Sequence, residues 1–114
     1  MIDPSREYIY CAATWFKEQP TAHFLPDNID KWVVIGGINH TQILHTANAL
    51  LGNVQFQQGK QEYGFLTSTN RFVDRIEACI IAKSQNQLNR YYDGDEKLYS
   101  EFIQTLNKKE NPLT

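Results

Sequence analysis

Two arginines stand four residues apart at a junction that the sequence predicts to lie between a strand and a helix. Arg71 precedes Asp74, and Arg75 follows it directly. Two guanidinium groups that point the same way near a helix N-terminus can clamp a phosphate through charge-assisted hydrogen bonds. The same side chains can instead form salt bridges to acidic neighbours, and the sequence leaves both interpretations open.

A pair of glycines, Gly36-Gly37, ends an apolar run and comes shortly before a predicted helix start at Asn39. Glycine lets a backbone approach a ligand closely, and the adjacent helix N-terminus favours anions. The pair lacks the third glycine of a dinucleotide-binding fingerprint and the Gly-Lys-Ser/Thr of a P-loop. It therefore indicates either a turn that approaches a phosphate or a tight strand-to-helix connection.

The histidines and cysteines show neither metal-ligand spacing nor a catalytic arrangement. His40 and His45 are five residues apart on one predicted helix, so they point about 140° from each other. A zinc-binding pair on a helix needs a spacing of three or four residues. Cys11 and Cys79 each lie in an apolar run, which favours buried free thiols over a disulfide. We expect no metal, no cofactor and no catalytic residue.

Length and charge limit what the chain can do. Its 114 residues suit one domain, residues 1–114, in which the tail from about residue 108 is expected to fray. With a net charge of −2, the chain generates no positive field for duplex nucleic acid. No apolar run reaches the roughly 20 residues of a membrane span, and no signal peptide is recognisable. We therefore expect a cytoplasmic protein with no membrane or duplex nucleic-acid partner.

The apolar pattern predicts the elements that must position these residues. Strands are predicted at residues 8–16, 31–35, 64–68 and 71–73, and helices at residues 39–51, from residue 74 onward and at residues 98–106. This order predicts an α+β fold in which a small antiparallel sheet carries two to three helices on one face. In the second helix, Ile76, Cys79 and Ile80 are expected to be buried. Residues 8–16 are apolar on both strand faces, so we expect helices on one face and a partner on the other.

The segments around the two arginines follow a recognisable pattern. The chain reads G-F-L-T-S at residues 64–68, F-V-D-R-I-E-A at residues 72–78 and L-Y-S-E at residues 98–101. Upstream, A-A-T-W-F at residues 12–16 is similar to an opening A-A-I-W-F/Y strand. Together these segments resemble the phage Thoeris anti-defence sponge proteins of the first described type. One departure lies at residues 35–37, where this chain has Ile-Gly-Gly and the family pattern continues with Cys-Gly-Arg.

The resemblance implies a protein that binds and hides a cyclic nucleotide immune signal without cleaving it. The implied ligand is a cyclic ADP-ribose isomer or, in some members, a cyclic oligonucleotide, and the implied assembly is a homodimer or homohexamer. The expected ligand-binding residues are Phe24, Trp32, Gly36, Gly37, Phe65, Thr67, Arg71 and Arg75. Phe24, Trp32 and Phe65 are the candidates for stacking on the adenine. Two other classes stay open: a protein–protein inhibitor or interaction module, and a hydrolase of small nucleotides.

Overall fold

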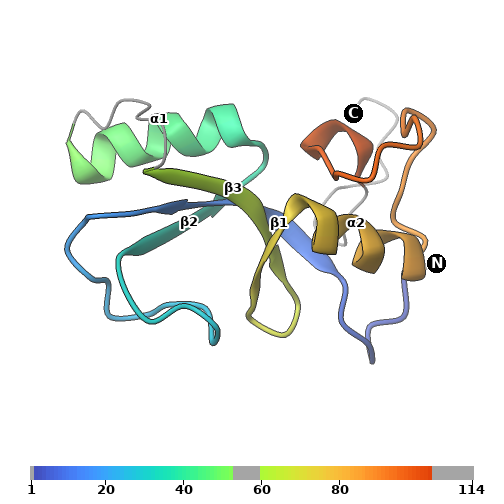
Figure 1. The fold of residues 1–114 in the computed structure, drawn as a ribbon, viewed down its shortest axis with the longest axis horizontal. Helices are drawn as coiled ribbons and strands as arrows, with labels where there is room; N and C mark the ends of the chain where they lie inside the picture. Colours follow the sequence, from blue (N-terminus) through green and yellow to red (C-terminus); the bar gives the residue numbers. More distant parts are fainter. Residues whose placement is uncertain (1, 53–59, 104–114) are drawn as a thin grey trace.

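The structure, a computed structural model, describes residues 2–52 and 60–103, and these form an antiparallel sheet with two helices (Figure 1). The strands are β1 Ile9–Phe16, β2 Val33–Gly37, β3 Gln61–Thr67 and β4 Phe72–Asp74, and the helices are α1 His40–Leu51 and α2 Arg75–Ser84. The strand order is β2-β1-β3-β4. The predicted α+β class is confirmed, whereas the tail from about residue 108 lies outside the described residues. No helix in the described ranges has the length and apolar character needed to cross a bilayer.

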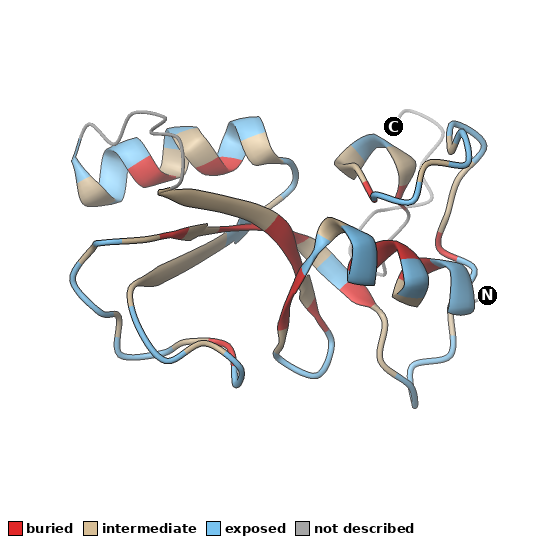
Figure 2. Ribbon diagram, viewed as in Figure 1, coloured by how far each residue is buried: buried red, intermediate tan, exposed pale blue. Residues whose placement is uncertain are grey.

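Both helices pack on the same face of the sheet. The register aligns Ala12 of β1 with Phe65 of β3, and Phe65 with Val73 of β4. These three side chains join Ile43 of α1 and Ala78 of α2 in a single hydrophobic core. Figure 2 shows the buried residues gathered along the middle of the sheet and on the inner sides of the helices. The sheet therefore fixes where the N-termini of both helices lie.

The N-terminus of α1 is set by a side-chain cap. The backbone N–H of Gln42 donates to the Asn39 side-chain oxygen at 2.8 Å, which satisfies one of the free donors of the first turn. The Gln42 side chain in turn accepts a hydrogen bond from the Ile38 amide at 3.1 Å. Ile43 and Ala47 are the residues through which α1 is buried. The helix thus begins as its sequence predicts, with its start held against the end of β2.

α2 buries a different side from the one that its sequence pattern predicts. Ala78, Cys79 and Ala82 face the core, which confirms the predicted burial of Cys79. Ile76 and Ile80 are 44% and 64% exposed, so their predicted burial is wrong. The helix begins directly after β4 with no linker, and the direction of the strand therefore sets which side of the helix meets the sheet. Small residues on that side let the helix lie close to the strands.

The glycine pair lies inside β2 rather than at a turn after it. Gly36 and Gly37 both pair with β1 in the antiparallel register. A Cβ atom on Gly37 would lie 2.3 Å from the Gln42 side-chain oxygen, and one on Gly36 would lie 2.9 Å from the Cys11 sulfur. A larger residue at either position would therefore displace side chains of the first turn of α1 or of the neighbouring strands.

Side-chain amides complete the backbone hydrogen bonding at the first residues of β4 and β1. Asn28 accepts from the Phe72 amide at 2.8 Å and donates to the Phe72 carbonyl at 2.7 Å. Gln87 does the same for Ile9, with distances of 2.8 and 2.9 Å. Each amide group therefore replaces a neighbouring strand at a position where backbone groups would otherwise lack a partner.

The third predicted helix, residues 98–106, is wrong over its described part. Only a single 3₁₀ turn, η1 Ser100–Phe102, is present there, and the rest of the predicted helix lies outside the described residues. Leu98 and Ile103 are buried, as their apolar character requires. The Leu98 amide donates to the Arg75 carbonyl at 2.9 Å, which ties this segment to the start of α2.

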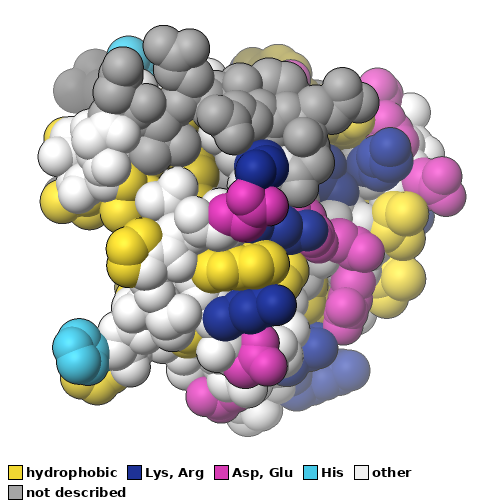
Figure 3. Space-filling view, turned by 60° about the vertical axis from the view of Figure 1, so that its left-hand side comes forward, with side chains coloured by type: hydrophobic (Ala, Val, Ile, Leu, Met, Phe, Trp, Pro, Cys, Tyr) yellow, Lys and Arg dark blue, Asp and Glu magenta, His cyan; other side chains and the backbone are white. Residues whose placement is uncertain are grey.

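Two tryptophans pack against each other on the sheet face away from the helices. The rings of Trp15 and Trp32 lie 5.5 Å apart, and both residues are half-buried. The Lys17 and Lys31 ammonium groups lie 4.9 and 4.2 Å from the centres of these rings. Figure 3 shows an elongated hydrophobic surface with basic side chains on either side of it. The apolar second face of β1 is therefore only partly covered within the described chain.

Both cysteines are free thiols, as the sequence predicts. Cys79 is buried in the core and Cys11 is half-buried on the opposite face of the sheet. Burial raises the pKa of the Cys11 thiol, so little thiolate is present at neutral pH. Neither residue has the environment of a reactive nucleophile.

Replacement of Asp74 by alanine is expected to lower the free energy of unfolding by about 0.5–2 kcal/mol. The Asp74 side chain caps α2 by accepting a 2.8 Å hydrogen bond from the Glu77 amide. Urea unfolding of the purified variant measures the effect. Asp74→Asn keeps a capping oxygen and serves as the control, with an expected change of a few tenths of a kcal/mol. Equal losses in both variants would contradict the capping role.

Candidate ligand-binding site

A cavity of about 440 Å³ lies between the N-terminus of α1, the start of α2 and η1. The residues that line it are Ile38, Asn39, His40, Thr41, Arg75, Tyr99, Ser100 and Glu101. In Figure 1 these three segments face one another near the middle of the molecule. The volume is in the range of small-molecule sites, roughly 300–1,000 Å³.

Arg75 reaches this cavity between two tyrosine rings. Its guanidinium carbon lies 5.2 Å from the ring centre of Tyr63 and 4.8 Å from that of Tyr99, within the range of cation–π attraction. Nη2 donates to His40 Nδ1 at 3.4 Å, and the buried Nε has no hydrogen-bond partner. Within the described ranges, no carboxylate forms an ion pair with Arg75. Burial lowers the pKa of Arg75, yet arginine titrates so high that the group stays charged at neutral pH.

His40 supports Arg75 without neutralising its charge. Its Nε2 lies 3.0 Å from the Gly64 carbonyl oxygen, an acceptor, so Nε2 carries the proton and Nδ1 keeps a lone pair. Nδ1 accepts from Arg75 and, at 3.3 Å, from the Ser100 hydroxyl. Burial, with a smaller contribution from the charge of Arg75, lowers the pKa of His40. A neutral imidazole therefore holds the guanidinium in place and leaves its positive charge available.

The N-terminus of α1 adds positive potential to the same cavity. Asn39 and Thr41 line the cavity, and no acidic residue lies in the first turn of α1. Unpaired backbone N–H groups and the helix dipole favour an anion at such a position. Among the lining residues, Glu101 of η1 is the one carboxylate. The cavity thus combines one guanidinium, one helix N-terminus and one carboxylate.

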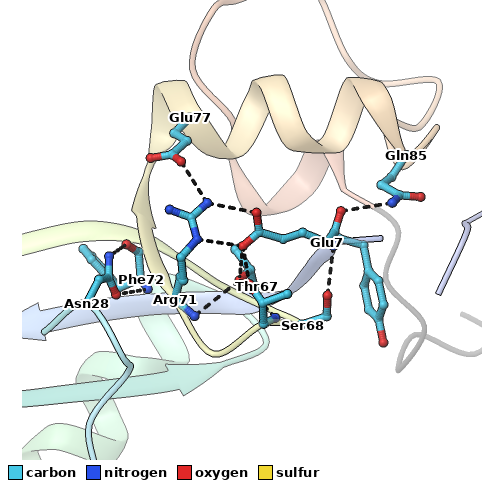
Figure 4. Close-up of polar contacts among 10 residues, drawn as sticks. Glu7, Asn28, Thr67, Ser68, Arg71, Phe72, Glu77 and Gln85 are labelled. Carbon is cyan, nitrogen blue, oxygen red and sulfur yellow. Dashed lines mark hydrogen bonds and ion pairs between the residues drawn. The ribbon is translucent and has the colours of Figure 1, made fainter. Parts of the chain in front are cut away.

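Arg71, predicted as the second arm of a phosphate clamp, is held by two carboxylates (Figure 4). Its Nε and Nη2 donate to the Glu7 carboxylate at 2.9 Å each, and Nη2 also donates to Glu77 at 2.9 Å. The hydrogen bonds from Arg71, with smaller contributions from those of Thr67 and Thr69, lower the pKa of Glu7 to about 2. Of the two interpretations left open by the sequence, salt bridges describe Arg71, whereas Arg75 has none within the described ranges.

Two further predicted site residues, both on β3, are buried and contact other side chains of the protein. Thr67 is buried, and its hydroxyl donates to Glu7 at 2.7 Å (Figure 4). Phe65 is fully buried and lies edge-on to His40, with ring centres 5.6 Å apart. Phe65 therefore supports the cavity from beneath and has no exposed surface with which to contact a ligand.

The other predicted residues lie elsewhere on the molecule. Trp32 packs on Trp15, and Gly36 faces the same side of the sheet, away from the helices. Gly37 lies against the first turn of α1, and Phe24 is 95% exposed in the segment before β2. Of the eight predicted residues, the cavity lining includes only Arg75.

Five residues around Arg75 were not predicted as site residues: His40, Tyr63, Tyr99, Ser100 and Glu101. The sequence contained features that could have identified most of these residues. His40 follows the cap Asn39, and a residue at that position must stand at a helix N-terminus. Tyr99, Ser100 and Glu101 belong to the L-Y-S-E pattern noted in the sequence. Tyr63 precedes the predicted third strand, and no sequence feature marked it.

Comparison with known proteins places the chain in a family. No curated protein and no solved structure matches it. A protein-family model described as Phage T4 y16D protein matches residues 8–103, a span that includes every residue lining the cavity. The chain therefore belongs to the Phage T4 y16D protein family.

Proposed function

We propose that this member of a phage protein family binds a small anionic cyclic nucleotide, an isomer of cyclic ADP-ribose, and sequesters it without cleaving it. In this role the protein is a sponge that counters a Thoeris-type defence signal. The observation that carries the proposal is the state of Arg75. It is a charged group beside a cavity of small-molecule size, its Nε lacks a partner, and the described residues supply no ion pair to it.

A pyrophosphate group matches the positive features of the cavity. Arg75 can donate charge-assisted hydrogen bonds from its Nη groups to phosphate oxygens. The first backbone N–H groups of α1, beside Asn39 and Thr41, can donate to the same anion. The ring of Tyr99 lines the cavity and offers an aromatic surface to the base. Binding through these groups needs neither a metal nor a cofactor.

The chemistry of His40 and Ser100 favours binding over hydrolysis. The Ser100 hydroxyl lies 3.3 Å from His40 Nδ1, which is the arrangement of a nucleophile and its base. However, Nδ1 also accepts a hydrogen bond from the cationic Arg75. Burial lowers the pKa of His40, which makes the imidazole a weaker base. A general base works best when its pKa lies near the working pH. The pair is therefore a weak catalyst in this environment.

A ligand-recovery experiment tests the proposal. The purified protein is mixed with cyclic ADP-ribose isomers, the free ligand is removed by filtration, and the protein is then denatured by heat. We expect the ligand to be retained by the folded protein and to return intact on denaturation. Hydrolysis products that disappear in Ser100→Ala would overturn sequestration and identify a hydrolase. Ligand that stays free throughout would overturn nucleotide binding and favour an interaction module.

We also propose that the protein forms a homodimer or homohexamer through the sheet face that carries Trp15 and Trp32. The two tryptophans on this face are only half-buried. Small soluble domains rarely leave a contiguous apolar surface exposed unless it contacts a partner. Light scattering at micromolar concentration is expected to give a mass of at least a dimer. Val34→Glu, on this face, should reduce the mass, whereas Ile80→Glu, exposed on α2, should not. A monomeric parent protein would contradict the assembly.

A further inference from the structure

Glu101 is an unexpected group in a cavity that binds an anion. It is exposed and lies in η1, and within the described chain its carboxylate forms no ion pair. Its backbone is fixed, because the Asn89 side chain donates to the Glu101 carbonyl at 2.8 Å. The charge of Glu101 acts to raise the pKa of Arg75, opposing the larger effect of burial. The two opposite charges therefore share one cavity without being in contact.

A cavity built only for a phosphate would gain nothing from this carboxylate, which repels anions. A ligand that satisfies both ends of the cavity needs an anionic group for Arg75 and hydrogen-bond donors for Glu101. A carboxylate has two acceptor oxygens, which match two neighbouring hydroxyl groups. An acidic side chain that accepts from the hydroxyls of ribose is the common solution in dinucleotide-binding proteins.

We propose that Glu101 binds the vicinal hydroxyls of a ribose and restricts this cavity to ribonucleotides in which a phosphate accompanies an unmodified diol. The inference rests on the proposed function, because Arg75 is taken to bind the phosphate of the same ligand. Ser100, next to Glu101, donates to His40, and His40 in turn accepts from Arg75. This chain of contacts connects the diol end of the cavity to the phosphate end.

A different role for Glu101 makes the opposite prediction. If the carboxylate only served as a nearby counter-charge for Arg75 in the empty cavity, every anionic ligand would have to overcome it. Its removal would then raise the affinity for nucleotides and for simple anions alike. Ribose recognition instead requires that its removal weakens nucleotides and leaves simple anions unaffected or better bound.

The test is calorimetry with Glu101→Gln and three probes: cyclic ADP-ribose, ADP-ribose and inorganic pyrophosphate. We expect the affinity for both nucleotides to fall roughly tenfold or more, because hydrogen bonds to a charged acceptor are lost. The affinity for pyrophosphate should be unchanged or higher. Glu96→Gln removes the same charge from an exposed loop position outside the cavity and should change none of the three values.

The parent protein provides a second measurement that does not depend on a variant. 2′-Deoxy-ADP lacks one hydroxyl of the single diol that ADP carries, and it should bind at least roughly tenfold more weakly than ADP. The inference would be overturned if Glu101→Gln bound the nucleotides as tightly as the parent protein or more tightly. It would also be overturned if the parent protein bound pyrophosphate but bound no nucleotide that carries a diol. A parent that binds ADP-ribose with Glu101 dependence but no cyclic isomer would overturn the proposed function alone. Binding of none of the probes would overturn both.

Discussion

Replacement of Arg75 by methionine is expected to leave the protein folded and to lower its affinity for a cyclic ADP-ribose isomer roughly 10- to 100-fold. The loss corresponds to about 1.5–3 kcal/mol, which is typical of one hydrogen bond to a charged group. Replacement of Arg75 removes its contacts to His40 and to two tyrosine rings, but within the described chain it breaks no ion pair and leaves no buried carboxylate unpaired. Methionine keeps an apolar stem between Tyr63 and Tyr99.

Two matched variants separate binding from folding in this experiment. Arg90→Met removes the same charge at an exposed position, where Arg90 stacks on Tyr91 outside the cavity, and it should not alter affinity. Arg71→Met breaks the contacts to Glu7 and Glu77, so it should lower the melting temperature and leave the affinity of the folded fraction unchanged.

Calorimetry and thermal melts on the three variants provide the measurements. Unchanged affinity in a folded Arg75→Met protein would remove Arg75 from the site. A large drop in its melting temperature would instead assign Arg75 a structural role. Either result would remove the main support for nucleotide binding in this cavity.

Replacement of Glu7 by glutamine is expected to lower the free energy of unfolding at pH 7 by about 2 kcal/mol. Arg71 donates two hydrogen bonds to the Glu7 carboxylate, and the hydroxyls of Thr67 and Thr69 donate to it as well (Figure 4). These contacts lower the pKa of Glu7 from 4.5 to about 2, the hydrogen bonds from Arg71 having the largest effect. Glutamine cannot accept four donors with a full negative charge, so it recovers only part of this stabilisation.

The pH dependence of stability gives a sharper test of the same carboxylate. Because the pKa of Glu7 is lower in the folded state, the unfolded chain binds more protons below pH 4.5. The contribution of Glu7 is therefore complete above about pH 5 and is lost as the pH falls towards 2. Urea unfolding between pH 7 and pH 3 should show a steeper loss for the parent than for Glu7→Gln.

Glu62 offers a matched control for this measurement. It forms a 3.3 Å ion pair with Lys17, and its side chain is 42% exposed. Exposed pairs of this kind contribute little, about 0–1 kcal/mol, so Glu62→Gln should have a small effect and keep the pH dependence of the parent. Parallel pH curves for the parent and Glu7→Gln would contradict the assigned role of Glu7.

The elements of this fold could be predicted where their signals are local. The β-rich run at residues 8–16, apolar on both faces, predicted β1 almost to its ends, and the caps Asn39 and Asp74 predicted the starts of both helices. Capping depends on residues three positions apart in sequence, so it needs no tertiary information. The buried side of α2 could not be predicted, because Ile76 and Ile80 form as good an apolar stripe as the residues that are buried.

The sequence by itself determined that this chain forms a small α+β domain with free thiols and with one arginine on each side of the residues that form β4. Only the tertiary structure decided what each arginine does. Arg71 meets Glu7, which lies 64 residues away in sequence, and Arg75 meets His40 and Tyr99 from two other elements. Salt bridges and cavities depend on distances between segments that are remote in sequence, and the pairing of β1 with β3 sets those distances. The sequence around the two arginines does not distinguish them, yet in the folded protein Arg71 forms salt bridges and Arg75 lines the candidate ligand-binding cavity.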